Sequence, residues 1–76
     1  MNKVRRKTIE EIISIMENLK ERIDNVSEEE QEAFDNLPEG LQASEKGEKM
    51  EENVGILEEA SSSLDDIVSN LQELLY

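Results

Sequence analysis

Apolar residues recur in alternating steps of three and four on both sides of the chain's only proline, Pro38. Before the proline, the series is Ile9, Ile12, Met16, Leu19, Ile23 and Val26, and Glu30, Ala33 and Leu37 continue its register more weakly. After the proline, it is Ala43, Gly47, Met50, Val54, Leu57, Ser61, Leu64, Val68, Leu71 and Leu75. Such spacing places all members of a series on one stripe of an α-helix. The sequence therefore predicts an all-α chain of two long helices.

Local signals set the expected helix boundaries. Thr8 and Glu11 match a capping box, in which the two side chains bond to free amide groups of the first turn. This predicts a basic tail over residues 1–7 and a first helix over residues 8–36. Pro38 disfavours helical geometry at Leu37 and suits the first turn of a new helix, so the turn is expected at residues 37–38 and the second helix at residues 39–75. Glycines lower the helix propensity of residues 40–49, so a loop is the alternative for this stretch.

Two helices of similar length joined by a tight turn are expected to form one domain, residues 8–76, folded as a long antiparallel hairpin with coiled-coil-like packing. A bend at residues 37–38 pairs Val26 with Met50, Ile23 with Val54, Leu19 with Leu57, Ile12 with Leu64, and Ile9 with Val68. Ser61 then faces Met16 as a polar layer in the seam. The basic tail, with Lys3 and Lys7, falls beside Asp65, Asp66 and Glu73.

A second apolar set is left over once the hairpin closes. Its members are Ile13, Ile15, Ala60, Ile67 and Leu74. A stripe this wide is typical of a helical bundle, and a chain of 76 residues buries only a thin core alone. The set therefore predicts self-association into a homo-oligomeric helical bundle, either a dimer or a tetramer. The alternative is that these residues flank the seam and stay half exposed.

The chain is strongly acidic, with 20 Asp and Glu against 8 Lys and Arg and a net charge of −12. This balance disfavours direct contact with nucleic acid or anionic membrane and favours a basic partner. The surface expected to meet that partner lies around the turn and on the second helix, and consists of Glu28, Glu29, Asp35, Glu39, Glu51, Glu52, Glu58 and Glu59. The alternative is a solvated surface that only keeps the protein in solution.

Motifs that carry chemistry are missing. The chain has no histidine and no cysteine, which removes the commonest general base and the thiolate nucleophile. Ser61, Ser62 and Ser63 have no neighbouring base in the sequence to activate a hydroxyl. We therefore expect no enzymatic activity, no cofactor and no metal site. No apolar run approaches the roughly 18 residues of a membrane span, and a cytoplasmic location is expected.

The segment "QEAFDNLPEGLQASEKGEKMEENVGILEEA", residues 31–60, resembles a segment of small acidic hypothetical proteins from bacteriophages and prophages of Gram-positive bacteria. The resemblance implies a phage-type accessory protein in the host cytoplasm that binds and inhibits a host protein, for example one of a defence system. It implies no catalytic residue. Two alternatives stand beside it: an acidic nucleic-acid mimic that occupies a DNA- or RNA-binding site, and a purely structural or assembly component.

Overall fold

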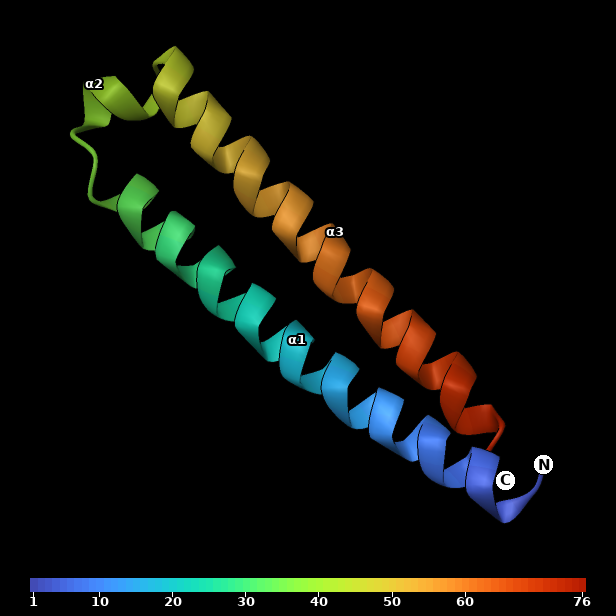
Figure 1. Cartoon of the computed structure of the whole chain (residues 1–76). Helices are drawn as coiled ribbons and strands as arrows, with labels where there is room; N and C mark the ends of the chain where they lie inside the picture. Colours follow the sequence, from blue (N-terminus) through green and yellow to red (C-terminus); the bar gives the residue numbers. More distant parts are fainter.

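The structure is a computed structural model that describes all 76 residues as an elongated helical hairpin (Figure 1). Its elements are α1 (Lys3–Asp35), α2 (Glu39–Gln42) and α3 (Glu45–Glu73). The long helices α1 and α3 lie side by side and run in opposite directions, so that both termini lie at one end and α2 at the other. The molecule measures 58 × 14 × 13 Å between Cα atoms. The predicted all-α antiparallel hairpin is confirmed.

Helix α1 begins at Lys3, five residues before the predicted start at Thr8. The Oδ1 atom of Asn2 accepts a hydrogen bond from the backbone N–H of Arg5 at 2.8 Å and caps the helix. Thr8 lies inside the helix, where its hydroxyl donates to the carbonyl of Val4 at 3.2 Å. The prediction of a separate basic tail over residues 1–7 is therefore wrong. Asparagine is among the best N-cap residues, and Asn2 provides an earlier cap than Thr8.

The chain bends at Leu37 and Pro38, as predicted. Helix α1 ends at Asp35, and the carbonyl of Pro38 accepts hydrogen bonds from the backbone N–H groups of Leu41 and Gln42 at 2.8 and 3.1 Å. The second helix is not continuous from residue 39, because Ala43 and Ser44 separate α2 from α3. The stretch of residues 40–49 is thus partly helix and partly loop.

A compact corner forms where α2 meets the start of α3. The Gln42 amide donates to the carbonyl of Phe34 in the last turn of α1 at 3.2 Å and to the carbonyl of Leu37 in the bend at 3.3 Å, which links α2 to the C-terminal end of α1. The Ser44 hydroxyl caps α3 by accepting a hydrogen bond from the backbone N–H of Gly47 at 3.4 Å. A Cβ atom on Gly47 would lie 2.1 Å from the carbonyl oxygen of Gln42, so only glycine fits there.

The corner moves the register of the hairpin away from the predicted one. In the structure, the Asn53 amide donates to Glu30 at 2.8 Å, and the Ser61 hydroxyl donates to Asp24 at 2.5 Å rather than lying opposite Met16. The predicted pairs, from Val26 with Met50 to Ile9 with Val68, are displaced by about two helical turns. Residues 39–44, which the prediction placed in the long second helix, form the corner and do not lie along α1.

Helix α1 is also rotated relative to the prediction. Ile13 and Ser27 are its buried residues, and Gly47, Val54, Ser61 and Val68 are the buried residues of α3. Of the predicted α1 stripe, Ile9, Met16 and Ile23 are half-buried, whereas the others are exposed: Ile12 by 37%, Leu19 by 41% and Val26 by 50%. Lys20 and Asp24 form polar contacts with α3, and this orientation of α1 turns Leu19 away from the seam.

The interior of the hairpin is thin. Only Ile13, Val54 and Val68 are buried hydrophobic residues, and no side chain is completely enclosed. The accessible surface is 5758 Å², whereas a compact monomer of 8.7 kDa is expected to expose about 4,700 Å². Much apolar surface thus remains in contact with solvent.

The close contact at the corner predicts that replacing glycine with alanine has opposite effects on stability at Gly47 and at Gly55. Gly47→Ala forces the Gln42 carbonyl away and should lower the free energy of unfolding by about 1–3 kcal/mol. Gly55→Ala is the control, because Gly55 is also inside α3 but its added Cβ meets no atom within 4 Å. It should raise the free energy of unfolding by about 1 kcal/mol through helix propensity. Urea denaturation followed by circular dichroism measures both, and equal effects would contradict the close contact.

Candidate functional site

A broad apolar face runs along one side of the hairpin. Its members are exposed aliphatic residues from both long helices, and we call them the apolar face: Ile12, Ile15, Leu19, Val26, Ile56, Ala60, Ile67 and Leu74. Ile12, Leu19 and Val26 recur every seven residues on α1, and Ala60, Ile67 and Leu74 recur every seven residues on α3. A seven-residue spacing keeps side chains on one side of a helix, so each series forms a continuous line.

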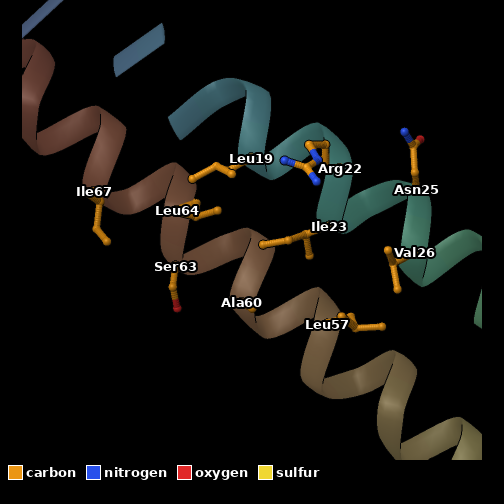
Figure 2. Close-up of a pocket in the computed structure, with 10 residues that line it drawn as sticks. All are labelled: Leu19, Arg22, Ile23, Asn25, Val26, Leu57, Ala60, Ser63, Leu64 and Ile67. Atoms are coloured by element: carbon orange, nitrogen blue, oxygen red, sulfur yellow. The ribbon is translucent and has the colours of Figure 1, made fainter. Parts of the chain in front are cut away.

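The half of the apolar face nearer the turn, from Leu19 and Ile67 to Val26 and Leu57, is hollowed into an open groove of about 810 Å³. Seven of its ten lining residues are hydrophobic, with Leu19, Ile23 and Val26 from α1 and Leu57, Ala60, Leu64 and Ile67 from α3. Figure 2 shows these side chains on the two neighbouring helices, with Arg22 and Asn25 on the α1 side. A smaller hollow adjoins the groove at Val26 and Leu57 and extends the apolar lining to Ile56. The groove is suited to apolar side chains of another protein surface.

Four of the five residues predicted for self-association lie on this face. Ile15 and Ile67 are 61% and 41% exposed, and Leu74 and Ala60 are exposed as well. Ile13 is only 6% exposed and lies in the seam, so its assignment to the outer set is wrong. Helix α1 has two neighbouring apolar stripes one residue apart, and the hairpin buries the stripe that contains Ile13.

Three residues of the face, Ile12, Leu19 and Val26, were predicted to lie in the seam, and Ile56 was not predicted. The sequence contains no local signal for the correct assignment. The residues of the face recur every seven residues, but the buried seam residues Val54, Ser61 and Val68 recur at the same spacing, so the spacing does not separate face from seam.

A polar cluster occupies the other side of the seam. The Lys20 ammonium lies 2.9 Å from Asp24 Oδ2 and 3.7 Å from Asp65 Oδ2, while Ser61 donates to the other oxygen of Asp24. The Ser61 hydroxyl, followed by the Lys20 ammonium, holds the pKa of Asp24 below its ordinary value of 3.8. The hydrogen bond to Asp24 raises the pKa of Lys20 above its ordinary value, although partial desolvation opposes this shift. The cluster links α1 to α3 through the Ser61–Asp24 hydrogen bond and the Lys20–Asp65 contact.

The predicted acidic surface is exposed at all eight positions: Glu28, Glu29, Asp35, Glu39, Glu51, Glu52, Glu58 and Glu59. Only Glu52 forms an ion pair, with Lys49 at 3.9 Å. Residues 24–55, which form the half of the hairpin around the turn, contain eleven acidic and two basic residues. This half therefore has a net charge of −9, and its negative electrostatic potential favours a basic partner.

The basic residues at the N-terminus do not pair with acidic residues of α3. No ion pair joins Lys3, Arg5, Arg6 or Lys7 to Asp65, Asp66 or Glu73, and Asp65 lies beside Lys20 instead, so that predicted pairing is wrong. The guanidinium of Arg6 donates to the carbonyl of Leu75. This contact places a positive charge at the C-terminal end of α3, where the helix dipole is negative.

The structure brings together no group of three or more histidine, cysteine, aspartate or glutamate side chains that could hold a metal ion. None of the helices combines the length and the apolar character that crossing a membrane requires.

Comparisons with known proteins add no assignment. No protein-family model matches the chain, and neither a curated protein nor a solved structure matches it at a significant level. The resemblance of residues 31–60 to small phage proteins stays a prediction.

The polar cluster predicts a pH-dependent effect of Ser61→Ala. Because the folded-state pKa of Asp24 lies below 3.8, its stabilising contribution is present above that pH and is lost as the pH falls through the folded-state value. We expect Ser61→Ala to lower Tm at pH 7 by roughly 5 °C and the difference from the unaltered protein to shrink below about pH 4. Ser62→Ala, at an exposed neighbouring position, is the control and should show no such shrinkage.

Calorimetry from pH 7 to pH 2.5 measures these differences. A Tm difference for Ser61→Ala that stays constant throughout would exclude the link between Ser61 and the Asp24 carboxylate.

Proposed function

We propose that the protein is a non-enzymatic helical interaction module that associates with a second copy of itself through the apolar face. The observation that carries this proposal is the contrast between the two sides of the seam. Seven large aliphatic residues are 37–61% exposed on the apolar face, whereas only three hydrophobic residues are buried in the hairpin. A soluble protein rarely leaves a contiguous apolar surface of this extent uncovered, and such surfaces mark interaction sites.

The free energy available from covering this face is large for so small a protein. Fully burying a Val, Leu or Ile side chain stabilises by about 1.5–3 kcal/mol, so burying the remaining half of one contributes about 1 kcal/mol. One whole side of the hairpin, two helices that are each about 10 Å wide and 50 Å long, has an area of on the order of 1,000 Å², and the apolar face covers about half of it. A dimer that uses this whole side, with the apolar face at its centre and polar residues around it, meets the roughly 800 Å² that each partner contributes to a standard protein interface.

The acidic half around the turn supplies a second surface. In our proposal, it binds a basic surface of a host protein and thereby inhibits that protein in the host cytoplasm. The net charge of −9 on residues 24–55 supports a basic partner, and the phage-type resemblance of residues 31–60 supports a host protein. A nucleic-acid mimic uses the same carboxylates, so the class of partner surface is a question for experiment.

Self-association is tested by placing a charge on the apolar face. Sedimentation equilibrium at micromolar concentrations should show oligomers for the unaltered chain and predominantly monomers for Ile67→Glu, because a carboxylate buried in an apolar interface is strongly unfavourable. Ser62→Glu adds the same charge at an exposed position away from the face and should preserve the oligomer. A compact, fully helical monomer of the unaltered chain at every concentration would refute the proposal.

The acidic surface is tested by charge reversal. We expect Glu28, Glu29, Glu51 and Glu52 changed together to Lys to abolish recovery of the host partner by a tagged chain, while helicity and oligomeric state are retained, since exposed substitutions usually cost little stability. Ile67→Glu separates this effect from that of the apolar face. If binding survives charge reversal and is lost only in Ile67→Glu, the acidic surface is not the binding site.

Raising the salt concentration separates the two classes of partner surface. Binding that relies on exposed carboxylates in phosphate-like positions should weaken steeply as the salt concentration increases, because salt screens exposed charges. Binding through a mixed apolar surface should change much less.

A further inference from the structure

We propose that the two hairpins pair apolar face to apolar face in opposite directions, around a two-fold axis that lies in the interface and crosses α1 at Leu19 and α3 at Ile67. In this arrangement α1 packs on the partner's α1 and α3 packs on the partner's α3, with the turn of each copy over the termini of the other. The inference rests on the proposed self-association and adds its orientation and its central residues.

The apolar residues are arranged symmetrically about this axis. Ile12 and Val26 each lie seven residues from Leu19, and Ala60 and Leu74 each lie seven residues from Ile67. Leu19 and Ile67 lie at the same level along the hairpin, because Lys20, next to Leu19, contacts Asp65, two residues from Ile67, at 3.7 Å. Helix α1 extends over Lys3–Asp35, so residue 19 is also its midpoint. A two-fold rotation there superposes the line of Ile12, Leu19 and Val26 on itself and the line of Ala60, Ile67 and Leu74 on itself, while Ile56 lies outside this symmetric part of the face.

Apolar contacts alone do not select this orientation. Two hairpins that point in the same direction can also cover the apolar face, with α1 of each copy over α3 of the other. Leu19 then lies over the partner's Ile67, and Ile12 lies over the partner's Leu74. The buried surface is similar in the two arrangements, so another force must choose between them.

The charge distribution favours opposite directions. Residues 24–55 have a net charge of −9, whereas the remaining residues contain six basic and nine acidic side chains and have a net charge of −3. Pairing in the same direction places the two −9 halves together. Pairing in opposite directions places each −9 half against the half that contains the basic N-terminus, which lowers the repulsion between the copies.

One basic side chain meets the partner's acidic half directly. Arg5 is exposed and lies seven residues before Ile12, so it continues the line of Ile12, Leu19 and Val26 toward the terminus. The two-fold rotation about Leu19 brings Arg5 over the partner's Ala33, one helical turn from the partner's Glu29. No ion pair holds Arg5 within its own chain.

Distances between nitroxide labels decide the orientation. The chain has no cysteine, so Glu39→Cys places one label at the turn and Asn18→Cys places one next to the axis. We expect labels at residue 39 to lie roughly 50–60 Å apart in the dimer, because they are at opposite ends of two hairpins. Labels at residue 18 should lie at a short distance in either orientation, so this variant reports dimer formation alone.

The outcomes separate this inference from the proposed function. A short distance at residue 39, together with coupling at residue 18, overturns the orientation and leaves self-association in place. No coupling between chains at either position overturns both.

Charge reversal provides a second, independent test. Arg5 and Lys46 are exposed residues in the first turns of α1 and α3, so reversing either has a similar effect on its own helix. In the opposite orientation, Arg5→Glu should raise the dimer Kd roughly fivefold at low salt, because it adds repulsion to the partner's acidic half. Lys46→Glu should lower Kd, because it lies near the partner's basic N-terminus. The reverse signs would show hairpins that point in the same direction.

Discussion

The hydrogen bond between Ser61 and Asp24 joins α1 and α3 inside the seam and favours the observed register and rotation of the two long helices. Ser61 is 6% exposed in the seam, and its hydroxyl reaches the carboxylate at 2.5 Å. Because a buried hydroxyl without a partner is unfavourable, the helices are held where Asp24 meets it. Lys20 adds contacts to Asp24 and Asp65 on the same side. With these polar residues in the seam, Ile12, Leu19 and Val26 of α1 face outward.

The corner at the turn provides the second constraint. Gln42 donates hydrogen bonds to the carbonyls of Phe34 at the end of α1 and of Leu37 in the bend, and Gly47 lets the backbone of Gln42 pass close to α3. Because of these contacts, residues 39–44 are not part of the long second helix. Each residue of α1 therefore faces a residue of α3 that lies about two helical turns further along the chain than a simple bend at Pro38 would place there. The side-chain amide of Gln42 and the absence of a side chain at Gly47 thus help to determine which residues of α1 and α3 face each other.

The resulting molecule has two different outer surfaces. One is an apolar face that contains a groove, and the other is an acidic half around the turn. An apolar face is suited to a neighbouring helical surface, whereas a field of exposed carboxylates is suited to a basic one. The separation of the two surfaces allows one to serve assembly while the other remains accessible, which is the basis of the proposed interaction module.

The sequence by itself determined the helical class, the bend and the overall antiparallel arrangement. The three-four spacing on both sides of Pro38 predicted two helices, since this local periodicity follows directly from the geometry of an α-helix. The exposure of the acidic surface also followed from the sequence, because carboxylates without partners remain in water.

Only the tertiary structure decided the register, the rotation of α1 and the membership of the apolar face. Ile12 and Ile13 are consecutive apolar residues of α1, and the local sequence does not indicate which of the two side chains faces α3. That choice depends on contacts between residues far apart in the sequence, such as Ser61 with Asp24, and on the space that Gly47 leaves for the corner. A rotation of one residue about a helix axis, about 100°, exchanges a seam position for an outer one.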